Sequence, residues 1–138
     1  MSIRSFVEAD TEAVVELWEV CGLTRPWNDP RKDIARKLSV QPELFLVLDL
    51  DGAVSGTAMV GFDGHRGWVY YLAVLPELQG GGHGRELMGA AEHLLLDLGC
   101  PKFNLQVREG NEAVIGFYRS LGYDVDPIVS MSKRLIPD

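Results

Sequence analysis

The sequence predicts an α+β fold in which helices pack on a mixed, mostly antiparallel sheet. Two amphipathic stretches open the chain, three extended stretches joined by tight turns follow, and helical and extended stretches then alternate to the end. This order, ααβββαβαβ, is typical of helices layered on a sheet. Because 138 residues with 46% hydrophobic positions can bury one core, we expect a single domain over residues 1–138.

Two helices are expected before the sheet. Asp10 can cap the first, and Gly22 can end it. Its apolar face follows the i, i+3, i+4, i+7 spacing and consists of Val14, Leu17, Trp18 and Cys21. After an irregular loop, Asp29 at the cap and Pro30 at the first helical position predict a second, short helix. Its buried side would be Ile34 and Leu38.

An antiparallel meander of three strands is expected next. Residues 44–50 and 53–61 are rich in apolar and β-branched side chains and flank the hairpin turn Asp51-Gly52. A second turn at Asp63-Gly64 leads into residues 67–74, whose aromatic and β-branched content again favours a strand.

Helical and extended segments alternate in the second half. A long helix carries the stripe Leu87, Met88, Ala91, Leu94, Leu95 and Leu98. Residues 102–107 are expected to form a strand. Asn111 then caps a helix that Gly122 ends, with Val114, Phe117, Tyr118 and Leu121 on one face. Residues 123–135 are expected to contain one or two closing strands, and exposed strands there make a homodimer a reasonable partner.

Composition excludes several classes of protein. The net charge of −7 argues against nucleic acid as a partner, since phosphate contacts require clustered Lys and Arg. No apolar stretch approaches the roughly 18 residues of a membrane span, and residues 1–8 lack the features of a secretory signal. We therefore expect a cytoplasmic protein. The two cysteines and three histidines show no ligand spacing, so we expect no metal.

The glycine run Gly80–Gly84 stands between the last strand of the meander and the long helix. Glycines there allow main-chain N–H groups to converge on a phosphate, and the helix N-terminus adds partial positive charge. The run lacks the Gly-Lys-Ser/Thr ending of a P-loop and the order of the dinucleotide fingerprint. A flexible surface turn is the alternative interpretation of the run taken alone.

Three motifs in register resemble those of the GNAT family of N-acetyltransferases. Gln79-x-x-Gly82-x-Gly84 matches that family's Arg/Gln-x-x-Gly-x-Gly/Ala signature, and residues 72–76 resemble the strand end that precedes it. Asn111, with the later Phe117-Tyr118 and Leu121-Gly122-Tyr123, resembles its Asn…Tyr…Gly-Phe/Tyr motif. The segments at 25–30 and 63–67 are similar to small bacterial members of the YpeA type.

This resemblance implies a sheet of six to seven strands flanked by about four helices, and transfer of an acetyl group from acetyl-CoA to a primary amine. The amine attacks directly in a ternary complex, with no covalent enzyme intermediate. Acetyl-CoA is then a co-substrate held by the glycine turn and the preceding strand. The residues implied for it are Leu72, Ala73, Val74, Gln79, Gly80, Gly81, Gly82, His83, Gly84 and Asn111.

The resemblance also implies that Tyr118 is the acid for the leaving thiolate, although it could be a core aromatic only. The acceptor would meet Arg25, Trp27, Asn28 and Tyr70, although the loop residues could instead stiffen their loop or make surface contacts. The general base is left open among Asp63, His65, Tyr70 and Glu77. A non-catalytic module that binds acyl-CoA or a partner is the alternative function, and an acyltransferase for longer acyl groups is a third.

Overall fold

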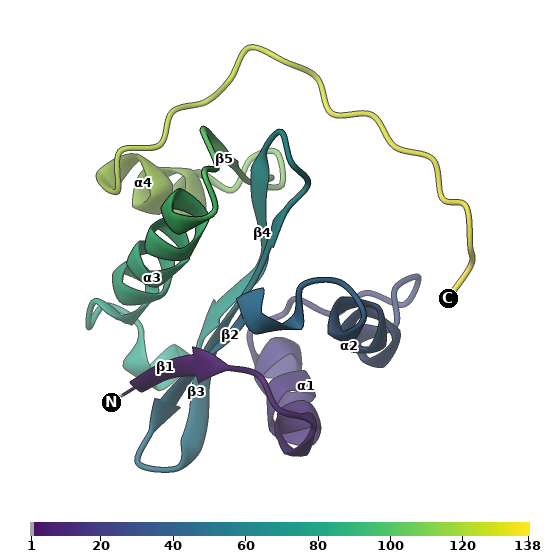
Figure 1. Ribbon diagram of the computed structural model, residues 1–138, viewed down its shortest axis with the longest axis vertical. Helices are drawn as coiled ribbons and strands as arrows, with labels where there is room; N and C mark the ends of the chain where they lie inside the picture. The colour runs from purple at the N-terminus through teal and green to yellow at the C-terminus, as the bar shows by residue number, and fades with distance from the viewer. Residues whose placement is uncertain (1) are drawn as a thin grey trace. The chain divides into compact units, whose positions relative to one another are not determined.

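The computed structural model describes residues 2–138, and its sheet has five strands in the order β1-β2-β3-β4-β5 (Figure 1). Neighbours from β1 to β4 are antiparallel, whereas β4 and β5 run parallel. The strands are β1 (Ser2–Ser5), β2 (Phe45–Leu50), β3 (Ala53–Phe62), β4 (Gly67–Val74) and β5 (Phe103–Asn104). The predicted meander is confirmed as β2, β3 and β4.

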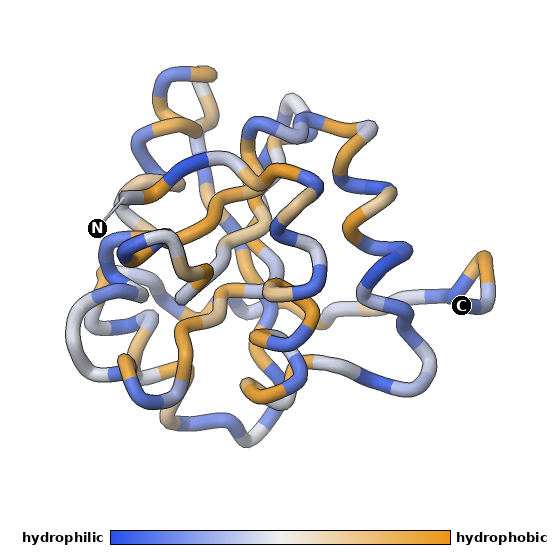
Figure 2. The backbone as a smooth tube through the Cα atoms, turned by 90° about the horizontal axis from the view of Figure 1, so that it is seen from below, coloured by the Kyte–Doolittle hydropathy of each residue, from blue (hydrophilic) through white to orange (hydrophobic). Residues whose placement is uncertain are grey.

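Helices cover both faces of this sheet. The helices α1 (Thr11–Val20) and α2 (Pro30–Leu38) lie on one face, and α3 (His83–Asp97) lies on the other (Figure 1). The helical turns alternate between hydrophobic and hydrophilic residues, as an amphipathic helix requires (Figure 2). Short 3-10 turns are η1 (Glu8–Asp10), η2 (Pro42–Leu44) and η3 (Pro76–Leu78). The helices are therefore placed to bury the sheet on both sides.

Two packed layers follow from this arrangement. The layer under α1 and α2 includes the fully buried Trp18, Phe45 and Val14. Against the other face, α3 buries Leu87, Met88, Ala91 and Leu95. Three residues of the predicted helical faces are more exposed than expected, because they stand near helix ends: Leu38 is 36% exposed, Leu98 is 50% exposed and Val114 is 36% exposed.

The two predicted N-caps in this half differ. The Asp29 carboxylate accepts a hydrogen bond of 2.9 Å from the main-chain nitrogen of Arg31, so the cap of α2 is confirmed. Asp10 does precede α1, but its side chain caps no N–H group of that helix. Its carboxylate instead accepts from the Val7 main chain at 2.9 Å and from Arg4.

Residues up to Leu105, together with Asp138, form one compact unit, and residues 106–137 form a second. The second unit contains α4 (Glu112–Ser120), whose cap at Asn111 is confirmed: its side chain accepts from the main-chain nitrogen of Val114 at 3.3 Å. The expectation of about four α-helices is thus met.

The strand count was wrong, since the described residues contain five strands rather than six or seven. The strand expected over residues 102–107 is only two residues long. Residues 123–135 form no strand, because an extended segment needs a hydrogen-bonding partner and the 106–137 unit contains no other strand. The short β1 was not predicted from the sequence.

No helix within residues 2–138 combines the length and the apolar character that crossing a membrane requires. Cys100 is buried and Cys21 is partly buried, and each thiol contacts a main-chain carbonyl. Burial raises the pKa of the Cys21 thiol, so this residue is a packed side chain rather than a ready nucleophile.

Candidate functional site

A bulge interrupts β4 at Tyr71. Thr57 pairs with Ala73 and Met59 pairs with Tyr70, so three steps along β4 oppose two steps along β3. Tyr71 adopts a positive φ of 52°, which is rare for a residue with a side chain. A β-bulge of this kind bends its strand and interrupts the ladder locally. Beyond Tyr71, β4 therefore changes direction while it still pairs with β3.

One edge of β4 is open beyond this bend. Strand β5 pairs only with Gly67 and Trp68, and no strand in residues 2–138 pairs with that edge from Val69 to Val74. The segment on the open side therefore offers main-chain donors and acceptors to a ligand.

The register fixes which groups point outward. The Leu75 nitrogen donates to the Ser55 carbonyl at 2.9 Å, which marks these two as a hydrogen-bonded pair. Bonded and non-bonded pairs alternate in an antiparallel ladder, so the adjacent pair of Gly56 and Val74 is non-bonded. The N–H group of Val74 consequently faces the open edge.

The glycine turn follows directly after this strand and η3. Gly80 and Gly82 have φ angles of 85° and 89°, a conformation that glycine adopts without steric cost. A Cβ atom at either position would meet nothing within 4 Å, so the turn is open on its outer side. Gly82 is the N-cap of the 15-residue helix α3 and no side chain caps that end. The free N–H groups of the first turn and the helix dipole fit an anionic phosphate.

Gln79 and His83 border this turn. The Gln79 amide donates a hydrogen bond of 3.0 Å to the Val74 carbonyl, which joins the turn to the end of β4. The buried Nδ1 atom of His83 has no hydrogen-bond partner among the described residues. The nearest carboxylate oxygen, from Glu86, lies 3.7 Å away.

The predicted acceptor residues Arg25, Trp27 and Asn28 lie in the loop between α1 and α2. Arg25 donates to the carbonyls of Gly22 and Thr24 at 2.7 and 2.8 Å, so part of its guanidinium is used within the loop. Trp27 is 55% exposed and does not fold into the core. The Asn28 amide points toward α2 and β4, where it donates to Asp33 and to the hydroxyl of Tyr71.

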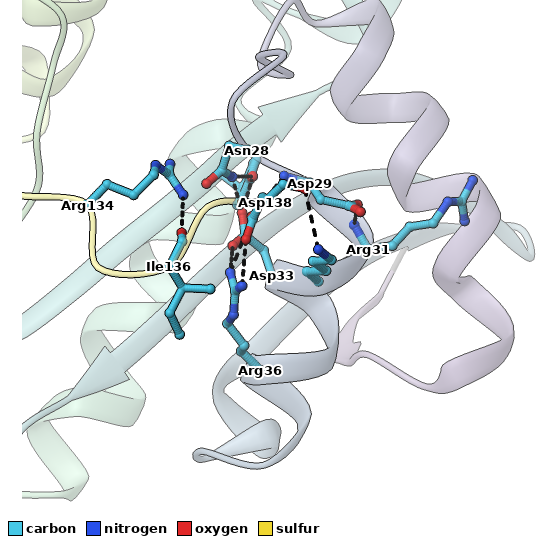
Figure 3. A network of polar contacts seen from close by, with 10 residues as sticks. Asn28, Asp29, Arg31, Asp33, Arg36, Arg134, Ile136 and Asp138 are labelled. Carbon is cyan, nitrogen blue, oxygen red and sulfur yellow. Dashed lines mark hydrogen bonds and ion pairs between the residues drawn. The ribbon is translucent and has the colours of Figure 1, made fainter.

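Asp33 lies in a polar network with Asn28, Arg36 and Asp138 (Figure 3). Tyr71 joins this network through its hydroxyl, and sequence reasoning missed both Asp33 and Tyr71. The Tyr71 hydroxyl donates to Asp33 at 2.6 Å, and Arg36 donates to the same carboxylate at 3.2 Å. Arg36 also binds Asp138 at 2.7 Å and lowers the pKa of that carboxyl to about 2. A polar residue such as Asp33 on a short, largely polar helix gives no signal in the sequence that it will meet a strand.

The candidate general bases do not converge. Asp63 and His65 lie in the turn before β4, and the eight residues of that strand separate them from Glu77 in η3. The Asp63 carboxylate accepts hydrogen bonds from the main-chain N–H groups of Arg66 and His65, which lower its pKa as expected of a turn residue. Tyr70 lies between these ends, is 50% exposed, and has a pKa raised by burial of its hydroxyl.

Tyr118 and Asn111 belong to the 106–137 unit. Tyr118 makes edge contacts with the rings of Phe117 and Tyr123, with centroids 5.1 and 5.9 Å apart. Burial raises the pKa of Tyr118 to about 12, so its hydroxyl keeps its proton at neutral pH. Asn111 uses its side chain to cap α4.

The part of the chain that the structure describes holds no group of three or more His, Cys, Asp or Glu side chains arranged to bind a metal ion.

Comparisons with known proteins agree with this geometry. The family model for the acetyltransferase (GNAT) family matches residues 6–123. An acetyltransferase of Yersinia enterocolitica is 51% identical over 138 residues, which cover 100% of this chain and 98% of that protein.

Two solved structures show the same fold. The ribosomal-protein-S18-alanine N-acetyltransferase of Escherichia coli has a TM-score of 0.72 and 25% identity, over 88% of this chain and 76% of that one. AAC(6')-Iy, in complex with the bisubstrate analog CoA-S-monomethyl-acetylneamine, has a TM-score of 0.77 and 16% identity, over 97% of this chain and 98% of that one. The chain belongs to the GNAT family of acetyltransferases and is an acyltransferase.

Proposed function

We propose that this protein is an N-acetyltransferase that transfers the acetyl group of acetyl-CoA to a primary amine within one ternary complex. The observation that carries the proposal is the open edge of β4, which leads into an uncapped, glycine-rich helix N-terminus. A long ligand with amide groups at one end and phosphates at the other matches these two features in order. The family match spans residues 6–123, which supports one functional domain over residues 1–138.

The main chain supplies most of the contacts to acetyl-CoA. Leu72 and Val74 offer the pantetheine amides an unpaired strand edge, as when a peptide adds to the edge of a sheet, and Ala73 lies between them in the same segment. The pyrophosphate lies against the N–H groups of Gly80 to Gly84, with His83 on the first turn of α3. Gln79 contributes by holding the turn to Val74. Asn111 begins α4 and is assigned to the same cofactor from its sequence motif.

Bound acetyl-CoA supplies an acetyl group activated as a thioester. The chain contributes the outward N–H group of Val74, which can polarise the thioester carbonyl. Tyr118 is assigned as the acid that holds a proton for the leaving sulfur, and its raised pKa keeps that proton in place at neutral pH. No side-chain nucleophile is needed, because a neutral amine forms the N–C bond directly as the C–S bond breaks. The proton that the nitrogen loses replaces the one that Tyr118 gives to the sulfur.

The loop with Arg25, Trp27 and Asn28 provides the acceptor side, together with Tyr70 on β4. The exposed Trp27 ring offers an apolar surface to an acceptor, since a large exposed aromatic side chain is otherwise unfavourable. The Arg25 guanidinium keeps donors that its two contacts within the loop do not use, and these can bind a carboxylate of the acceptor. Arg25→Ala should then raise the acceptor KM with little change in the KM for acetyl-CoA.

The first experiment is thermal melting with acetyl-CoA, CoA, ATP and NAD. A ligand that binds only the native state stabilises it, by about 2.7 kcal/mol at 100 times its Kd. Stabilisation by both CoA species and not by ATP or NAD is expected, and no shift with acetyl-CoA would overturn the cofactor assignment.

A second experiment separates an enzyme from a binding module. Release of CoA thiol from acetyl-CoA is measured with an alanine-initiated peptide, lysine, spermidine and an aminoglycoside. An amine-dependent rate supports the transferase. Binding of acetyl-CoA without acceleration by any primary amine would favour a non-catalytic acyl-CoA-binding module.

A further inference from the structure

Tyr71 makes two sets of contacts that lead to different parts of the molecule. Its main chain and ring belong to the bulge in β4, whereas its hydroxyl reaches the loop and helix on the proposed acceptor side. The bulge in β4 therefore includes a side chain that spans the distance between the two substrate-binding regions.

Two buried residues, Thr57 and Trp18, hold the main chain of Tyr71 in place. Thr57 donates its hydroxyl to the Tyr71 carbonyl at 2.7 Å, and the Trp18 indole donates to Thr57 at 2.9 Å. Thr57 and Trp18 are fully buried, and the Trp18 and Tyr71 rings stack with centroids 3.7 Å apart. These contacts hold a positive φ angle that a tyrosine would otherwise avoid.

The hydroxyl of Tyr71 closes a triangle of hydrogen bonds with Asn28 and Asp33. It donates to Asp33 at 2.6 Å and accepts from the Asn28 amide at 3.2 Å, while Asn28 also donates to Asp33. The three residues come from β4, the α1–α2 loop and α2. A hydroxyl bound to a carboxylate is among the stronger hydrogen bonds in proteins, so this triangle fixes the loop to the strand.

A phenylalanine could supply the ring stacking without the hydroxyl, so packing alone does not explain a tyrosine here. Burial and the neighbouring Asp33 both raise the pKa of the Tyr71 hydroxyl, which keeps it a donor through the neutral range. The loop side of the triangle carries Asn28 next to the exposed Trp27 and to Arg25. On the strand side, Tyr71 directly precedes Leu72 to Val74, the segment of β4 proposed to bind the cofactor.

We infer that Tyr71 is a positioning residue that fixes the acceptor loop, residues 22–29, at a set distance from the cofactor strand through Asn28 and Asp33. Occupation of β4 by acetyl-CoA then orders the loop before the amine arrives. This inference rests on the proposed function, because it assumes that β4 binds the cofactor.

The test is amide hydrogen exchange with and without saturating acetyl-CoA, in wild type and in Tyr71→Phe. In wild type, acetyl-CoA should slow exchange in residues 69–76 and also in residues 22–33, by at least about threefold in each. In Tyr71→Phe, acetyl-CoA should still slow amide exchange in residues 69–76 but should no longer slow it in residues 22–33. Asn28→Ala, which cuts the triangle from the loop side, should give the same result.

Arg31→Gln is the matched control. Arg31 pairs with Glu12 and so links α2 to α1 without touching the Tyr71 triangle. This variant should keep loop protection within about twofold of wild type. The variants should also bind acetyl-CoA with a Kd within about threefold of wild type by calorimetry, since a merely damaged fold would weaken binding as well.

The outcomes separate the two proposals. Protection of the strand without the loop in wild type, or loop protection that survives in Tyr71→Phe, would overturn the positioning role and leave the cofactor assignment intact. Protection of neither segment would overturn the cofactor assignment, and this inference with it. A turnover measurement with the amine panel adds a last check: Tyr71→Phe should raise the acceptor KM at least about fivefold and leave the KM for acetyl-CoA near wild type.

Discussion

The side-chain amide of Gln79 donates to the main-chain carbonyl of Val74 over 3.0 Å, so the first residue of the glycine turn is fastened to the last residue of β4. The Val74 carbonyl also accepts from the Cys21 thiol at 3.3 Å. With its carbonyl used in this way, Val74 keeps its N–H group for a ligand at the open edge. The strand and the glycine turn can therefore act as one preformed surface.

Replacing Gln79 by Met should weaken acetyl-CoA binding. The variant keeps the length of the side chain but removes the donor, and a lost hydrogen bond of this kind is worth about 1 kcal/mol, which is about fivefold in Kd. Calorimetry with acetyl-CoA measures the change. Gln41→Met is the control, because Gln41 makes the corresponding contacts to Phe62 at the end of β3, away from the turn. An equal loss of affinity in both variants would argue against a specific role for Gln79.

Replacing Gly82 by Ala should reduce stability and acetyl-CoA affinity together. Alanine at a φ of 89° is strained by roughly 1–2 kcal/mol, and relief of that strain moves the N–H groups that begin α3. Gly52→Ala is matched to it: Gly52 has a φ of 84°, equally open surroundings, and a place in the β2–β3 hairpin. Both variants should melt several degrees lower, but Gly52→Ala should bind acetyl-CoA like wild type. Unchanged affinity in Gly82→Ala would show that the turn does not bind the phosphates.

Replacing Tyr118 by Phe should lower kcat by about 10²-fold, the range typical of a lost general acid, while the Kd for acetyl-CoA stays within a few-fold. Because burial raises the pKa of Tyr118 to about 12, wild-type kcat should show no loss from this residue up to about pH 10. Steady-state kinetics across pH 6–10 tests both statements. Turnover equal to wild type in Tyr118→Phe would remove the residue from the mechanism.

Features that one or two residues decide were predictable from the sequence. The Asp29-Pro30 start of α2, the Asp51-Gly52 hairpin and the Asn111 cap depend on local backbone chemistry, and each is present. The glycine turn was found for the same reason, since the spacing of Gln79 and the glycines is itself the signal. A prediction from local sequence is wrong where another partner competes for the same group. The Asp10 carboxylate does not cap α1, because it accepts hydrogen bonds from Arg4 and from the Val7 main chain.

Features that depend on distant partners were not predictable. A bulge adds one residue to a strand, and nothing in the run Tyr70-Tyr71 shows which tyrosine lies at the bulge and which stays in the regular ladder. The four residues of β1 are too few to show an alternating pattern. Residues 123–135 have the composition of a strand, but composition does not provide the neighbouring strand that the ladder needs.

The stability of the protein in acid should depend on the charge of the Asp10 carboxylate. Asp10 is 7% exposed and accepts hydrogen bonds from Arg4 at 2.8 and 3.0 Å and from the Val7 main chain at 2.9 Å. The Arg4 hydrogen bonds lower its pKa below the usual value in spite of its burial. The ionised form is thus preferred in the folded state, and Asp10 stabilises the fold at every pH above its unfolded pKa of about 3.9. As the pH falls from there through the lower folded pKa, protonation removes that contribution.

The free energy of unfolding in urea should therefore differ between wild type and Asp10→Asn by about 1–2 kcal/mol at pH 7, and the two free energies should converge below pH 4. Glu12→Gln, which breaks the exposed pair with Arg31, should change stability little at any pH. A difference between wild type and Asp10→Asn that stays constant down to pH 2 would mean that Asp10 acts through packing and not through its charge.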